Sequence, residues 1–146
     1  STDISTRNAI SLGSLNGSNG FRLDGVTADD RLGDSVSNAG DVNGDGFADV
    51  IVGALGADPN GDISGSSYVV FGKASGFSAA MDLSSLDGSN GFRLDGVAAY
   101  DYSGRSVSGA GDVNGDGFDD LIIGAPAADP NGKMIQREGE DDDHTY

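Results

Sequence analysis

The 146-residue sequence contains no cysteine and no tryptophan, and it has only three prolines and one histidine. The absence of cysteine excludes a disulfide framework and thiol chemistry. The one histidine, His144, lies in a polar segment, so Ser-His-Asp and Cys-His mechanisms have no credible general base. Carboxylates are plentiful, but those with a recognisable spacing have another explanation, given below. We therefore predict that the chain is not an enzyme.

Positive charge is also scarce. The chain has 8 lysines and arginines against 24 aspartates and glutamates, which gives a formal net charge of −16. This balance argues against nucleic acids and anionic membrane surfaces as partners. Long apolar runs are missing as well, so membrane insertion is not expected. What the chain has in abundance is glycine, with 25 residues.

The sequence contains an internal repeat with a constant offset of 71 residues. Segment 17–26 returns unchanged at 88–97, and segment 39–47 returns unchanged at 110–118. A constant offset means that the two copies share one backbone path. Within a copy, short apolar runs are separated by glycine-rich turns, which predicts four short antiparallel strands. Four such strands correspond to one blade of a β-propeller, so the predicted fold class is all-β.

Each copy carries the nine-residue loop Asp-Val-Asn-Gly-Asp-Gly-Phe-x-Asp, with oxygen-bearing side chains at positions one, three, five and nine. Ca²⁺ takes about six to eight oxygen ligands, and three carboxylates in one loop would repel each other without a cation. By analogy with other calcium loops, position seven offers its carbonyl while its ring packs beneath the loop. The predicted ligands of two Ca²⁺ sites are Asp41, Asn43, Asp45, Phe47 and Asp49, and Asp112, Asn114, Asp116, Phe118 and Asp120.

An EF-hand opens with the same D-x-N-x-D-G pattern but needs a bidentate glutamate at position twelve. Val52 and Ile123 stand at that position here. The apolar runs 50–54 and 121–125 that follow the loops are short and contain glycine, which is typical of buried strands. A plain Asp/Asn/Gly turn remains the alternative, and the repetition of the loop weakens it.

These motifs resemble the FG-GAP repeat family, the β-propeller repeats of integrin alpha subunits and of many bacterial surface proteins. The family pattern is F-G-x-S-V, then the calcium loop, then a strand ending in G-A-P. It is matched at 32–36, 41–49 and 53–55, and again at 103–107, 112–120 and 124–126. The phenylalanine is absent from both copies, and Leu55 replaces the proline in the first. The resemblance implies a calcium-stabilised structural or adhesion module, extracellular or at the cell surface.

The repeat divides the chain into four expected segments. They are the outer strand of a preceding blade (1–25), a first FG-GAP repeat (26–96), a second, incomplete repeat (97–132), and an acidic tail predicted to be disordered (133–146). Closed propellers have about four to eight blades, so one chain is expected to hold an incomplete ring. We expect the ring to be completed by a homo-oligomer, a trimer or tetramer, or by neighbouring blades of a longer chain.

Small residues dominate the strands expected at 35–39 and 106–110, which we call the small-residue strands. The copies differ most just before them, where 27–31 reads Thr-Ala-Asp-Asp-Arg and 98–102 reads Ala-Ala-Tyr-Asp-Tyr. Tyr100, Asp101 and Tyr102 are candidate ligand contacts, because the two rings could stack on a sugar or grip a peptide. The alternative is that the tyrosines pack on the next blade. The resemblance implies that ligands bind on the loops opposite the calcium loops. A calcium-dependent lectin-like glycan binder and an accessory propeller of a secreted hydrolase are the alternative functions.

Overall fold

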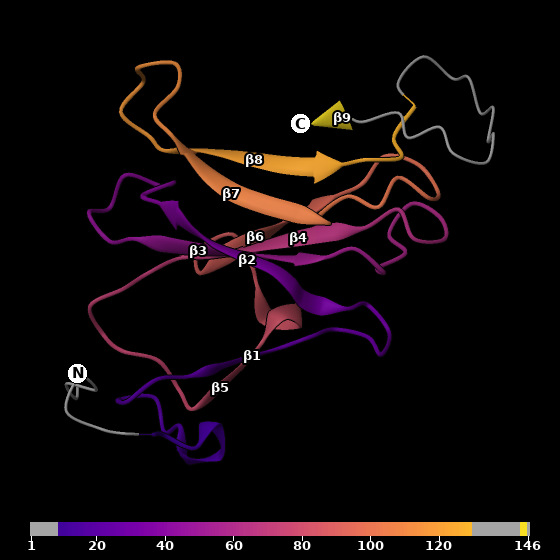
Figure 1. The fold of residues 1–146 in the computed structure, drawn as a ribbon. Helices are drawn as coiled ribbons and strands as arrows, with labels where there is room; N and C mark the ends of the chain where they lie inside the picture. Colours follow the sequence, from indigo (N-terminus) through magenta and orange to yellow (C-terminus); the bar gives the residue numbers. More distant parts are fainter. Residues whose placement is uncertain (1–8, 130–143, 146) are drawn as a thin grey trace.

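The computed structural model describes residues 9–129 and 144–145 (Figure 1). Its strands are β1 (Arg22–Asp24), β2 (Leu32–Gly40), β3 (Asp49–Ala54), β4 (Ser66–Val70), β5 (Ala80–Asp82), β6 (Gly91–Asp95), β7 (Ser106–Gly111), β8 (Asp120–Ala125) and β9 (His144–Thr145). The helical elements are two single turns of 3-10 helix, η1 (Leu12–Ser14) and η2 (Leu83–Ser85). The predicted all-β class is therefore confirmed.

The first blade is a four-stranded antiparallel sheet with the order β2-β3-β4-β6. Its outer strand, β6, contains the second copy of the Phe-Arg-Leu sequence. All four strands of this blade lie within residues 26–96. The earlier Phe-Arg-Leu sequence lies in and just before β1, which pairs in parallel with β5 to form a separate two-stranded layer.

The sheets stack in three layers, with β1–β5 on one side of the first blade and the second blade, β7-β8-β9, on the other (Figure 1). The two central strands of the first blade are consequently buried on both faces, β3 from Ile51 to Ala54 and β4 throughout. Ile51 and Val69 pack toward the second blade with Ile123, while Tyr68 and Val70 belong to the core on the opposite side. Burial of Ile51 and Val52 on opposite faces of β3 explains why the apolar run in this strand is continuous instead of alternating.

The two blades approach each other closely through glycine. A Cβ built on Gly53 would lie 2.0 Å from the carbonyl oxygen of Gly104, and a Cβ on Gly109 would lie 2.6 Å from the carbonyl oxygen of Asn38. Real Cβ atoms do not come this near to backbone oxygen, so no larger residue fits without moving the chain. The abundance of glycine therefore has a packing role at the contact between blades.

The second blade is a three-stranded sheet with the order β7-β8-β9. Its third strand comes from His144 and Thr145, which pair with Ala125 and Gly124. Apart from those two residues, the tail predicted to be disordered lies outside the described residues. Within 9–129 and 144–145 the sheets form no closed ring, and no helix there is long and apolar enough to cross a membrane.

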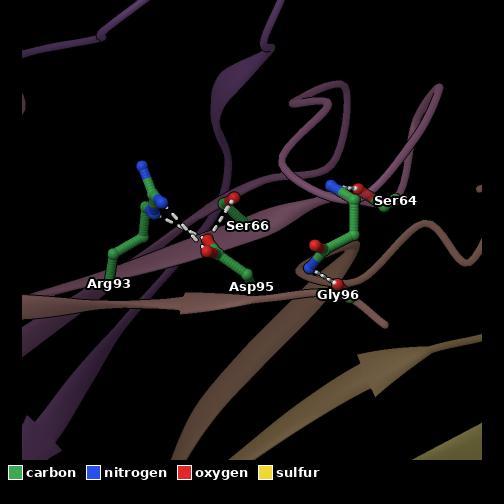
Figure 2. Close-up of polar contacts among 6 residues, drawn as sticks. Ser64, Ser66, Arg93, Asp95 and Gly96 are labelled. Carbon is green, nitrogen blue, oxygen red and sulfur yellow. Dashed lines mark hydrogen bonds and ion pairs between the residues drawn. The ribbon is translucent and has the colours of Figure 1, made fainter. Parts of the chain in front are cut away.

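Polar side chains join the outer strand to the rest of the first blade (Figure 2). Asp95 accepts hydrogen bonds from Arg93 Nη2 at 2.9 Å and from Ser66 Oγ at 3.0 Å. Asn60 Nδ2 donates to the carbonyl oxygen of Gly96 at 2.7 Å. Asp95 therefore links β6 to β4, and the loop before β4 is attached to the turn after β6.

Candidate functional site

The first loop, 41–49, wraps its backbone around the carboxylate of Asp41. Oδ1 of Asp41 accepts hydrogen bonds from the N–H groups of Gly44 at 2.8 Å and Asp45 at 3.1 Å, and Oδ2 accepts from Gly46 at 2.9 Å. Gly44 and Gly46 have φ of 76° and 88°. Glycine reaches this left-handed region without a Cβ penalty, and that conformation turns successive N–H groups toward one carboxylate.

Asp49, the ninth loop residue, is the most buried member, with 1% of its surface exposed. Its Oδ2 accepts from the N–H of Val42 at 2.8 Å, and its Oδ1 accepts from the N–H of Gly72 at 2.8 Å. One carboxylate thus joins the start of the loop, the start of β3 and the segment after β4. The side chains of Asn43 and Asp45 are exposed, and Asn43 Nδ2 donates to Asp45 Oδ2 at 3.2 Å.

The second loop, 112–120, repeats this geometry. Asp112 accepts from the N–H groups of Gly115 at 2.8 Å and Gly117 at 2.9 Å, and Asp120 Oδ2 accepts from the N–H of Val113 at 2.7 Å. These backbone donors, Gly117 foremost, lower the pKa of Asp112 below its ordinary value, so the carboxylate is charged at neutral pH. Two loops of identical pattern therefore adopt the same conformation on neighbouring blades.

The donors of each loop suit a hard cation in type. They are carboxylate, amide and carbonyl oxygens, which are the ligands that Ca²⁺ prefers. Each carboxylate oxygen that accepts one N–H retains further acceptor capacity. Within 9–129 and 144–145, however, no group of three or more His, Cys, Asp or Glu side chains is arranged so that it could hold a metal ion. The loop residues share one tight turn, but their carboxylates do not converge on a common point.

The ring of Phe118 does not lie where the sequence predicted. Phe47 and Phe118 are 42% and 46% exposed. The ring of Phe118 lies against Gly44 of the first loop, where an added Cβ would be 2.6 Å from its Cε1. The prediction that each ring packs beneath its own loop does not describe Phe118, because the two loops are neighbours and Gly44 leaves room for the ring.

A contact that sequence reasoning missed joins the two loops. Asp119 donates its N–H to the carbonyl oxygen of Asp41 at 3.0 Å, and its Oδ2 accepts from the N–H of Asp41 at 2.7 Å. Asp119 is the eighth residue of the second loop, and the first loop has Ala48 at that position. The signal was present in the sequence, since position eight is the one difference between two otherwise identical loops.

A cavity of about 660 Å³ lies beyond the other end of β3. The first loop precedes β3 at Asp49, whereas the cavity begins at Leu55 and Gly56, directly after Ala54. A strand of six residues separates the two by roughly 20 Å. The polar and aromatic residues that line the cavity are Asp29, Arg31, Asp58, Asp62, Tyr100 and Tyr102.

Several residues that line this cavity have an unusual backbone conformation. The described residues include five non-glycine residues with positive φ, between 52° and 68°, and all five line it: Asp29, Arg31, Ile63, Tyr100 and Tyr102. This region of φ costs bulky side chains on the order of 1 kcal/mol or more each. Tyr100 and Tyr102 are the repeat counterparts of Asp29 and Arg31. The two copies therefore keep the backbone conformation and change the side-chain chemistry.

The structure brings Tyr100 and Tyr102 to the cavity but not Asp101. Asp101 is buried, and its Oδ2 accepts from the N–H of Ala98 at 2.8 Å, so it holds the turn that carries the tyrosines. The N–H groups of Tyr100 and Tyr102 donate to the carbonyls of Asp62 and Ile63, at 2.7 and 3.1 Å. Sequence reasoning missed Asp58 and Asp62, although Asp58 lies in an Ala-Asp-Pro-Asn-Gly motif at 57–61 that returns at 128–132.

Asp30, beside the cavity, provides a pH test. Burial raises the pKa of its carboxyl above the ordinary value, and the charges of Asp58 and Asp29 add to this, while the Thr27 backbone opposes it. A raised pKa in the folded state means that stability falls as pH rises from about 4 through the folded pKa. Asp30→Asn should therefore be modestly more stable than the parent at pH 7 and no more stable at pH 3, in urea titrations at both values.

These features define a class: an all-β protein of stacked propeller blades with D-x-N-x-D-G-x-x-D loops at one end of the central strands and a lined cavity at the other. The FG-GAP repeat matches the chain at residues 32–70 and 103–141. These matches cover more than half of its length, and the chain belongs to the FG-GAP repeat family.

Its curated relatives include integrin alpha subunits. The chain is 33% identical over 103 residues to integrin alpha-4 of Xenopus laevis, 35% over 98 residues to integrin alpha-M of Mus musculus, and 37% over 103 residues to integrin alpha pat-2 of Caenorhabditis elegans. The aligned parts are 68%, 65% and 68% of this chain but 9%, 8% and 8% of the relatives. The chain thus spans less than a tenth of their length.

Proposed function

We propose that this chain is a calcium-binding, non-catalytic adhesion module that acts outside the cell or at its surface. The fold and the family support a β-propeller module of the integrin alpha type. The two loops are the basis for proposing a bound metal, and the cavity is the basis for proposing a ligand. Further blades would complete the propeller, supplied by other copies of the chain or by a longer polypeptide.

The observation that carries the calcium proposal is the identical geometry of the two loops. In both, a carboxylate at position one accepts hydrogen bonds from backbone N–H groups of the loop, and a carboxylate at position nine accepts one from the N–H of the second loop residue. The exposed oxygens at positions three and five can then turn toward a cation. When bound, Ca²⁺ neutralises the mutual repulsion of the carboxylates, and the residues of the loop supply its oxygen ligands.

Calcium should therefore stabilise the fold. At a concentration tenfold above Kd, two sites add about 1.4 kcal/mol each, which raises Tm by roughly 6–10 °C. Asp45→Ala should lose about half of this gain and change Tm little in chelator, because the Asp45 side chain is exposed and accepts local hydrogen bonds from the N–H of Phe47 and from Asn43 Nδ2. Differential scanning calorimetry in calcium and in EGTA measures both effects.

Asp34→Ala is the matched control, since it removes the same charge from an exposed residue outside the loops. It should keep the whole calcium-dependent gain. Equal losses for Asp45→Ala in calcium and in EGTA would contradict the proposed site, as would a calcium response that Asp34→Ala reduces as much as Asp45→Ala.

We propose the cavity as the ligand site. It is lined by two tyrosine rings, three carboxylates and one guanidinium. Five of its lining residues have a left-handed backbone conformation. Bulky residues retained in that conformation suggest a requirement for these side chains, since glycine would relieve the strain. Tyr100 is 40% exposed and can reach a bound molecule.

A calcium-dependent lectin is the second candidate, favoured by the combination of tyrosine rings and carboxylates, which supply stacking surface and hydrogen-bond acceptors for sugar hydroxyls. On a glycan array, the wild type should bind at least one class of glycan, and Tyr102→Ala should lose the signal. Val97→Ala, at an exposed residue outside the cavity, should keep it. An array without signal, or one unaffected by Tyr102→Ala, would exclude the lectin and leave the protein ligand.

A further inference from the structure

The two repeats allow each surface of the second blade to be compared with its covered counterpart on the first. Ile51 is fully buried where the first blade meets the second, whereas its counterpart Ile122 is 43% exposed. Ala39 is buried, and its counterpart Ala110 is exposed. A shallow groove of about 160 Å³ runs along this side of β7 and β8. We call it the open face, defined by Ser106, Ser108, Ala110, Ile122 and Gly124.

On the first blade, the corresponding face receives the second blade through two polar contacts. The carboxylate of Asp119 lies over Gly40 and accepts from the N–H of Asp41 at 2.7 Å. The carbonyl oxygen of Gly104 lies over Gly53 and accepts from Ser35 Oγ at 2.7 Å. A third contact is the Phe118 ring against Gly44, described above.

The open face carries the same receiving groups. Gly111 and Asp112 correspond to Gly40 and Asp41, and both glycines share a left-handed φ, 71° and 72°. An added Cβ at Gly111 would meet nothing within 4 Å, nor would one at Gly115, the counterpart of Gly44. Ser106 and Gly124 likewise correspond to Ser35 and Gly53. The surface that receives a blade is therefore present twice in the described residues and filled once.

The incoming blade must satisfy two requirements that the first repeat does not meet. Gly109 packs so closely on the backbone at Asn38 and Ala39 that a Cβ would lie 2.6 Å from an oxygen, yet the first repeat has Asn38 in the place of Gly109. The aspartate that accepts from the first residue of the neighbouring loop is missing too, since Ala48 stands in the place of Asp119. If the first blade of another copy docked on the open face, its Asn38 side chain would clash with the backbone there. Its Ala48 could not accept the hydrogen bond that Asp119 accepts.

We infer that the open face is a docking surface for a further blade of the second-repeat kind, with glycine and aspartate at the places of Gly109 and Asp119. The first repeat of another copy is not its partner, so of the two sources of further blades proposed above this inference favours a longer polypeptide. Two positions decide which blades can be neighbours: position eight of the loop (Ala48 or Asp119) and the fourth residue of the small-residue strand (Asn38 or Gly109). This inference rests on the observed contact between the two blades and is independent of the metal and of the cavity ligand.

The absence of cysteine makes a clean test available, because Ile122→Cys places the single thiol of the chain on the open face. In the full chain, a thiol reagent should label it rapidly at every protein concentration. A second copy of residues 62–132, with isoleucine kept at the place of Ile122, is then inserted after residue 132. The insertion preserves the 71-residue offset and supplies a further blade. Labelling of the thiol should slow at least about tenfold, as expected when a local opening must precede the reaction.

A matched chain carries Gly109→Asn and Asp119→Ala in the inserted copy alone, and labelling should return to the rate of the full chain. If that insert shows no cooperative thermal transition, Asp119→Ala alone provides the comparison. Equal protection by both inserts would overturn the selectivity, and no protection by either would overturn the docking surface. Protection of the full chain that grows with its concentration would show that copies dock on one another, which would also overturn the inference.

Discussion

Asp49→Ala should lower the free energy of unfolding by about 3 kcal/mol in chelator, and by about 1.4 kcal/mol more in calcium because Asp49 is also a proposed ligand. The carboxylate is 1% exposed, and each of its oxygens accepts one backbone N–H, from Val42 and from Gly72. Hydrogen bonds to charged acceptors contribute about 1.5–3 kcal/mol each, and alanine removes both. Urea titration measures the loss, and Asp49→Asn should fall between alanine and the parent because its amide oxygen can replace one acceptor.

The repeat provides the control. Asp120 occupies the same place in the second loop but is only half-buried, and it accepts from the N–H of Val113. Asp120→Ala should therefore cost less than Asp49→Ala. A loss for Asp49→Ala that occurred in calcium and vanished in chelator would mean that the residue acts through the metal alone, contrary to the structural role argued here.

The second large effect is expected for Gly53→Ala, which should cost about 3 kcal/mol or more. Its new Cβ would lie 2.0 Å from the carbonyl oxygen of Gly104 and 2.3 Å from Ser35 Oγ. The backbone oxygen cannot rotate away, so the second blade would have to move off the first. The core around Ile51 and Ile123 would then lose contact, and chemical denaturation should report a lower midpoint.

Gly124→Ala is the matched control at the same position of the second repeat. The nearest atom to its new Cβ is Ser106 Oγ at 2.4 Å, a side-chain oxygen that can change rotamer. It should cost less than about 1 kcal/mol. Similar losses for the two variants would mean that contact between the blades does not set the requirement for glycine at position 53.

The class of fold could be predicted from the sequence because the two copies of the repeat can be recognised directly. A constant offset, identical loops and apolar runs bounded by glycine indicate strands and blades without any long-range information. The loop residues from Asp41 to Asp49 were also predictable, since their hydrogen bonds are local: Asp41 accepts from residues three to five positions ahead. The predicted calcium at these loops stays a proposal.

What the sequence alone determined about this protein is its local chemistry: two loops that differ only at position eight, glycines placed for left-handed turns, and an all-β repeat. Tertiary structure decided the rest. Asp101 and Tyr100 are adjacent in sequence, yet one is buried in a turn and the other lines the cavity. Asp119 became a bridge to Asp41, 78 residues earlier, because blade stacking brings two loops together. Such contacts depend on how whole sheets pack, and a local pattern carries no information about which surfaces will meet.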